Sequence, residues 1–231
     1  MYKTFSFRQS NLWYGDEFYS SDGSRVGRCQ GIIFYILANL YESEGDNITP
    51  DKAFELTEMY VKMFNLTKNR ITGMPTIIEN ISKLGSKISQ LQKNYGHLKP
   101  IGFTLRNFSE KGYGIIYMKA FSRAENIPST VHAGGIFFHQ RNEMKNYMKD
   151  HQELKPNHVG LLVWDNSKLF IFDPNTGGQL VDKKYFTAQG IEGRLNLMYI
   201  TNNRPTRVRI ILIVKPDFFN EKNSYFSDAL R

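Results

Sequence analysis

The hydrophobic pattern of the chain changes near residue 100, from helical periodicity to short apolar runs. Residues 32–41 are apolar on nearly every side and follow a loop rich in Ser, Asp and Gly. A helix that is apolar all round must be buried, so we predict a central helix from about Cys29 to Tyr41. Thr49 as N-cap and Pro50 in the first turn start a second helix. One face of that helix carries Ala53, Leu56, Tyr60, Met63 and Phe64.

A third helix is predicted over residues 73–93, where apolar residues recur every three or four positions. After Pro100 the pattern favours strands at 102–105, 113–118, 159–164, 168–172, 195–200 and 208–214, with a short helix over 143–150. The turn residues 165–167 join two of these strands into a hairpin. Helices first and antiparallel strands afterwards predict an α+β fold, with a central buried helix packed on a C-terminal antiparallel sheet.

The length of 231 residues and a hydrophobic content of 41% suit a single domain spanning 1–231. Within it we expect a mainly helical part at 1–98, a mainly β part at 99–219 and a polar tail at 220–231. Residues 1–21 are aromatic and are expected to pack on the surface without regular structure. The chain contains no run of eighteen apolar residues, so no membrane span is predicted. The first residues lack the apolar stretch of a cleaved signal peptide.

Lys and Arg exceed Asp and Glu by 8, and the pI is near 9.4. The basic residues are spread along the chain and form no recognition helix or polybasic tail, so they favour a solvated basic surface and no nucleic-acid partner is expected. Peripheral contact with an acidic membrane face stays open. One cysteine excludes an intramolecular disulfide, and with five scattered histidines it argues against a zinc site. We expect no metal and no organic cofactor.

Cys29 is the only cysteine, and it lies in the first turn of the predicted central helix. The unpaired N–H groups of that turn and the positive end of the helix dipole favour a thiolate over a thiol. A lone cysteine is also often a small buried hydrophobic residue. A catalytic role for Cys29 therefore depends on finding a base beside it.

His158 is the predicted base, because the hairpin places a carboxylate beside it. His158 opens the first strand, and Asp173 ends the second. With the turn centred near residue 166, position 158 pairs with about position 173 or 174, and cross-strand Cβ atoms are about 5 Å apart. Asp173 can then accept from one ring nitrogen while the other faces Cys29. Read separately, His158 merely starts a strand and Asp173 begins an Asp-Pro-Asn turn; together with Cys29 they favour a catalytic triad.

The other histidines lack such an orienting carboxylate. His132 and His139 flank the apolar run 134–138 and are the reserve candidates for the base, whereas His97 and His151 lie in polar surroundings and are expected at the surface.

Arg28-Cys29-Gln30-Gly31 before an apolar helix, then His158-Val159-Gly160-Leu161 and Phe172-Asp173-Pro174-Asn175, resembles the papain-like cysteine proteases of the YopT/AvrPphB type. The resemblance covers roughly residues 15–215 in layout and about a dozen residues in identity. It implies a papain-like fold with Cys29 as nucleophile, His158 as general base and Asp173 as its orienter. It also implies a bacterial effector that reaches the host cytosol without a cleaved signal peptide and cleaves a host protein.

One position departs from that pattern. Papain-like enzymes usually carry an amide side chain five or six residues before the cysteine, to help hold the oxyanion, and this chain has Ser24 and Gly23 there. The backbone N–H of Cys29 with Ser24, or an amide from Gln30 or Asn157, are the candidate donors. Losing one oxyanion donor costs on the order of a hundredfold in rate.

Two other functions fit the same residues. The triad could deamidate or transglutaminate a host glutamine, since the acyl-enzyme chemistry is shared. Alternatively, the chain is a non-catalytic binding module with a relic pocket. The net positive charge mildly favours a neutral or acidic target sequence, and the sequence does not predict the oligomeric state.

Overall fold

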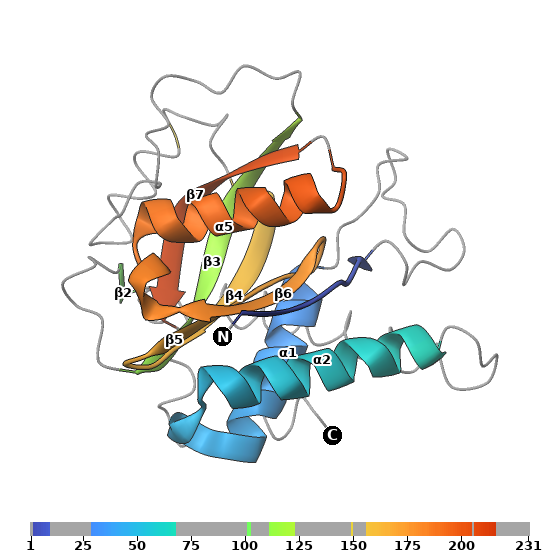
Figure 1. Ribbon diagram of the computed structural model, residues 1–231, viewed down its shortest axis with the longest axis vertical. Coiled ribbons are helices and arrows are strands. Elements are labelled where there is room, and N and C mark those ends of the chain that lie inside the picture. Colours follow the sequence, from blue (N-terminus) through green and yellow to red (C-terminus); the bar gives the residue numbers. More distant parts are fainter. Residues whose placement is uncertain are drawn as a thin grey trace.

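The computed structural model describes residues 2–9, 29–67, 101–102, 111–122, 149, 156–204 and 206–215. Across these residues, seven strands form one curled sheet in the order β1-β6-β5-β4-β3-β7-β2, and every neighbouring pair is antiparallel (Figure 1). The strands are β1 (Lys3–Phe5), β2 (Ile101–Gly102), β3 (Gly112–Ser122), β4 (His158–Trp164), β5 (Lys168–Asp173), β6 (Gly177–Asp182) and β7 (Thr206–Lys215). The predicted antiparallel sheet is confirmed.

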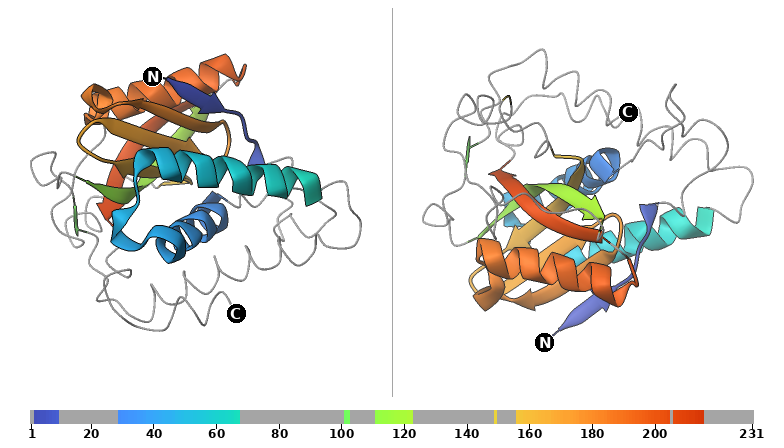
Figure 2. Two further views of the ribbon diagram at one scale, coloured as in Figure 1. Left: turned by 60° about the horizontal axis from the view of Figure 1, so that its bottom comes forward. Right: turned by 90° about the horizontal axis from the view of Figure 1, so that it is seen from above.

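Helices cover both faces of this sheet. Helices α1 (Cys29–Glu44) and α2 (Pro50–Thr67) lie on one face, joined by the 3₁₀ turn η3 (Gly45–Asn47), and α5 (Ala188–Thr201) lies on the other (Figure 2). A second 3₁₀ turn, η6 (Lys183–Tyr185), precedes α5. Alternate residues of the central strands therefore pack into two separate hydrophobic clusters, one on each face.

The predicted central helix is α1, and it packs against β4. Its side chains at Ile32, Ile33, Ile36, Leu37 and Leu40 are fully buried. Burial of each such side chain contributes about 1.5–3 kcal/mol, so the apolar run holds the first turn of α1, and with it Cys29, in a fixed position over the sheet.

The second predicted helix is α2, and its start is as predicted. The Oγ1 atom of Thr49 accepts from the Lys52 N–H at 3.3 Å, and the Thr49 carbonyl accepts from the Ala53 N–H at 2.9 Å. The buried face differs in part from the prediction. Ala53 is buried, but Met63 is 45% exposed, because the residues that turn toward the sheet are Phe54, Thr57 and Val61.

Helix α5 corrects the prediction of a strand over 195–200. A short apolar run does not distinguish a strand from a buried helix segment. Here Ile191, Leu195 and Met198 step by four and three and pack against the sheet, while the Thr187 side chain caps the helix by accepting from the Gly190 N–H at 2.9 Å. The first residue of this helical spacing, Ile191, precedes the apolar run 195–200 and lies in a stretch of mainly polar sequence.

The N-terminal segment corrects a second prediction, since Lys3–Phe5 is a regular edge strand that pairs with β6. Strand β6 was not predicted. Of the strand predicted at 102–105, Gly102 belongs to β2, and 103–105 lie outside the described residues. The predicted helix at 73–93 and the polar tail at 220–231 lie outside the described residues, as does the short helix at 143–150 apart from Lys149, which is helical.

Candidate active site

Cys29 is the first residue of α1, and its side chain is 8% exposed. The packing of α1 against β4 brings this end of the helix to the start of the strand. The Cys29 sulfur there accepts hydrogen bonds from the ring of His158 and from the backbone N–H of Val159. The structure therefore brings together the cysteine and the histidine that the sequence nominated.

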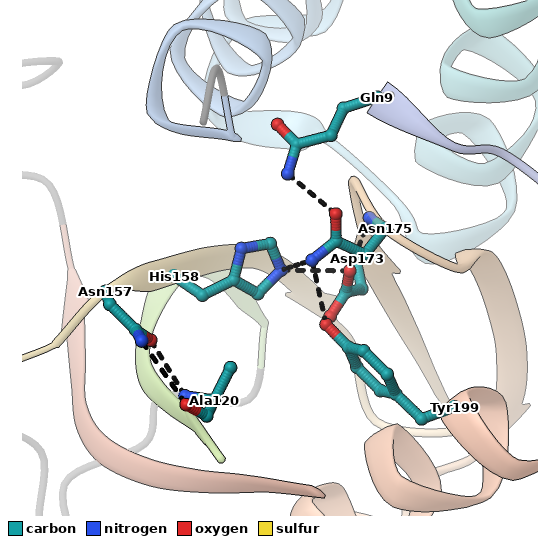
Figure 3. Close-up of polar contacts among 7 residues, drawn as sticks. All are labelled: Gln9, Ala120, Asn157, His158, Asp173, Asn175 and Tyr199. Atoms are coloured by element: carbon teal, nitrogen blue, oxygen red, sulfur yellow. Dashed lines mark hydrogen bonds and ion pairs between the residues drawn. The ribbon is translucent and has the colours of Figure 1, made fainter. Parts of the chain in front are cut away.

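The His158 ring is held from its other side by Asp173. The Nε2 atom of His158 lies 3.0 Å from the Asp173 Oδ1 atom, and the two side chains are buried, at 4% and 0% exposure (Figure 3). A carboxylate only accepts, so Nε2 carries the hydrogen and Nδ1 is the ring nitrogen left to face Cys29. The same Oδ1 atom accepts from the Asn175 N–H at 2.6 Å. The predicted contact between His158 and Asp173 is confirmed.

The strand register that produces this contact is not the predicted one. Leu161 pairs with Phe172 and Trp164 with Leu169, and continuing that register places position 158 opposite 175. His158 and Asp173 are therefore diagonal neighbours. The turn is centred between residues 166 and 167, because the Asp165 carboxylate accepts from the backbone N–H groups of Ser167 and Lys168 and fixes a longer turn.

The electrostatics of the three residues favour a charge-separated pair. Burial lowers the pKa of His158, but the charge of Asp173 and its hydrogen bond, helped by Cys29, raise that pKa to about 10. Burial raises the pKa of the Cys29 thiol, but the hydrogen bond and positive charge of His158 and the Val159 N–H outweigh it and lower that pKa. Both shifts favour the charge-separated form, with the proton on the ring and the sulfur as a thiolate.

Three further side chains support the site, and none of them was predicted (Figure 3). Asn175 Nδ2 donates to the hydroxyl of Tyr199 at 3.1 Å and lies 3.4 Å from His158 Nε2. Gln9 Nε2 donates to Asn175 Oδ1 at 2.7 Å, and the Gln9 backbone N–H donates to the Pro174 carbonyl at 2.7 Å. Asn175 could have been found from its place in the Asp-Pro-Asn turn, whereas Gln9 carries no sequence signal and Tyr199 lay in a segment read as a strand.

The candidate oxyanion donors are placed only in part. Ser24 lies outside the described residues, and Gln30 follows Cys29 in the first turn of α1. The Asn157 carboxamide is engaged elsewhere, since its Oδ1 accepts from the Ala120 N–H at 2.8 Å and its Nδ2 donates to the Ala120 carbonyl at 3.3 Å. His97, His132, His139 and His151 also lie outside the described residues.

Within the described ranges, no group of three or more His, Cys, Asp or Glu side chains is arranged to hold a metal ion. In the same part of the chain, no helix combines the length and apolar character that a membrane crossing requires.

Comparison with known proteins gives no match: no protein-family model, no curated protein and no solved structure is similar to this chain.

Proposed function

We propose that this protein is a cysteine protease in which Cys29 is the nucleophile and His158 the general acid and base. Asp173 orients the His158 ring and stabilises its positive charge. One observation carries the proposal. The only cysteine of the chain lies at the start of a buried helix and accepts hydrogen bonds from a histidine whose other ring nitrogen contacts a buried carboxylate. A structural cysteine needs no such partners.

The reaction follows from the position of each proton. The Cys29 thiolate attacks the carbonyl carbon of a peptide bond, and His158 donates its Nδ1 proton to the departing amine as the C–N bond breaks. His158 then takes a proton from a water molecule, which attacks the thioester and releases the acid and the Cys29 sulfur. The Asp173 carboxylate stabilises the imidazolium that is present before the first transfer and after the second.

The papain-like assignment belongs to this proposal as well. The chain order Cys, His, Asp, a buried helix led by the cysteine and an antiparallel sheet that carries the other two residues support it. By the same resemblance we propose a bacterial effector acting on a protein substrate in the host cytosol. The positive net charge favours a target sequence that is neutral or acidic around the cleaved bond.

The direct test maps new protein N-termini in a host-cell lysate after incubation with the wild-type protein or with Cys29→Ala. We expect one or a few new termini with the wild type and none with Cys29→Ala. Cleavage by Cys29→Ala at the wild-type rate would refute the proposal. Intact target proteins that gain about one dalton would instead reassign the triad to glutamine deamidation, since only the carbonyl donor differs.

A second test uses the thiol alone. Because Cys29 is the only cysteine, alkylation by iodoacetamide reports on this one sulfur. We expect alkylation to persist well below pH 8.5, the pKa of an ordinary thiol. A titration curve centred near 8.5 would support a binding module with an unactivated cysteine.

A further inference from the structure

The Asp173 carboxylate has one oxygen that its described neighbours leave without a hydrogen bond. Oδ1 accepts from His158 Nε2 and from the Asn175 N–H, whereas Oδ2 is fully buried and makes no hydrogen bond within the described part of the chain. A buried carboxylate oxygen that is left without a donor is costly. The site therefore needs a donor for Oδ2.

The Tyr199 hydroxyl has a hydrogen available for this oxygen. Tyr199 is 1% exposed, and its oxygen already accepts from Asn175 Nδ2 at 3.1 Å. A phenol donates one hydrogen, so accepting from Asn175 turns the O–H bond away from that amide. In Figure 3 the hydroxyl of Tyr199 points from α5 toward the Asp173 carboxylate. Burial, and after it the charge of Asp173, raise the pKa of Tyr199, so the phenol keeps its proton.

We propose that Tyr199 is a positioning residue of the site, which donates its hydroxyl hydrogen to Asp173 Oδ2 and thereby holds that carboxylate in place beside His158. Asn175, held by Gln9, fixes the direction of the hydroxyl. The chain of hydrogen bonds runs from the N-terminal segment through the 174–176 turn to α5. Tyr199 acts only through Asp173 and touches no reacting atom.

Asp173 interacts with titratable groups from several elements, and each bears on the expected pH dependence. These groups are Cys29 of α1, His158 of β4, Tyr199 of α5 and Arg204, which follows α5. Burial, and after it the charge of Arg8 in the N-terminal segment, lower the pKa of Arg204. Replacing Tyr199 leaves all these other charges in place.

The inference rests on the proposed thiolate chemistry, and its test measures the pH dependence of Cys29 alkylation by iodoacetamide in Tyr199→Phe. Without the hydroxyl, the Asp173 carboxylate is no longer held against the ring, and His158 loses part of the contact that sustains the thiolate. We expect the acid limb of the profile to move up by about one pH unit, a tenfold lower rate on that limb, with an unchanged rate at high pH. Tyr185→Phe, which changes a tyrosine that stacks on Arg194, is the matched control and should leave the profile unchanged.

A fluorinated tyrosine at position 199 separates donation from packing. Its hydroxyl is a stronger donor in a ring of nearly the same shape, so the acid limb should move to lower pH. If the limb moves in neither variant while the wild type keeps its low-pH reactivity, the role of Tyr199 is refuted and the proposed function stands. If wild-type Cys29 titrates as an ordinary thiol, both are refuted.

Discussion

Opposing effects act on the proton shared by Cys29 and His158. Burial disfavours a charge on either residue, whereas the Asp173 charge and the hydrogen bonds between the residues favour it. Both pKa values move in the direction of charge, so the local contacts exceed the cost of burial at this site. The lowered pKa of the Cys29 thiol thus depends on three side chains together.

The variant Asp173→Asn tests that dependence. The substitution keeps the shape of the side chain but removes the charge that holds the proton on His158, so the pKa of Cys29 should rise toward that of a free thiol. We expect the alkylation rate of Cys29 near pH 6 to fall about tenfold or more. Asp182→Asn, an exposed carboxylate at the end of β6, is the control and should match the wild type. Equal profiles for both variants would remove Asp173 from the site.

The three central site residues could be predicted from the sequence, because each is tied to a local signal. Cys29 marks a helix start, and His158 and Asp173 are neighbours in one hairpin. Gln9 and Tyr199 could not be predicted, because they reach Asn175 from segments that are distant in the chain. Only tertiary packing brings them together.

At the level of elements, the docking of the N-terminal segment against β6 depends on a single glycine. Gly177 begins β6 with φ +110, a conformation that residues with a Cβ rarely adopt. A Cβ atom at Gly177 would lie 2.0 Å from the Phe5 carbonyl oxygen and 2.8 Å from the Phe7 nitrogen. The close contact between this turn and residues 5–7 is what carries Gln9 to Asn175.

The variant Gly177→Ala should therefore displace the segment and destabilise the protein. Positive φ and the backbone clash together predict a loss of about 2 kcal/mol or more in the free energy of unfolding, measured in urea. Gly193→Ala is the matched control, since that helical glycine is exposed and an added Cβ there meets nothing within 4 Å. The control should be stabilised by about 0.5–1 kcal/mol. Equal stability of the two variants would contradict the importance of the docked segment.

At this scale, long and strongly patterned elements were predictable and short ones were not. Helix α1 is apolar all round and α2 carries a cap, so both are encoded locally. Helix α5 has its most apolar stretch in its second half, which by itself reads as a strand. β1 is an edge strand of three residues whose position depends on β6.

For the molecule as a whole, the charge-separated pair sets how stability depends on pH. The raised pKa of His158 stabilises the folded protein; this contribution is fully present below the unfolded pKa of about 6.5 and is lost as the pH rises through about 10. The lowered pKa of Cys29 also stabilises the folded protein; this contribution is fully present above the unfolded pKa of about 8.5 and is lost as the pH falls through the folded pKa. At pH values above both the unfolded pKa of His158 and the folded pKa of Cys29, up to about 8.5, the two trends cancel, because folding only moves a proton from sulfur to ring.

The variant Cys29→Ala removes the sulfur and, with it, the pH-dependent contribution of Cys29 to stability. In Cys29→Ala the stabilisation from His158 should decline with rising pH above about 6.5, by up to about 1.4 kcal/mol per unit. The wild-type contribution of the pair should decline less over the same range, up to about pH 8.5. Urea unfolding of both proteins across this range measures the difference. Parallel curves would show that no proton passes from Cys29 to His158 on folding.

The distance along the chain between Cys29 and its partners has a consequence for biogenesis. A ribosome releases the cysteine long before it makes the hairpin of β4 and β5 or the helix that bears Tyr199. Until those later segments dock, the emerging polypeptide carries an unremarkable thiol that cannot attack its neighbours. On the proposed chemistry, the protein would hydrolyse peptide bonds only once folding is complete, which protects the cell that synthesises it.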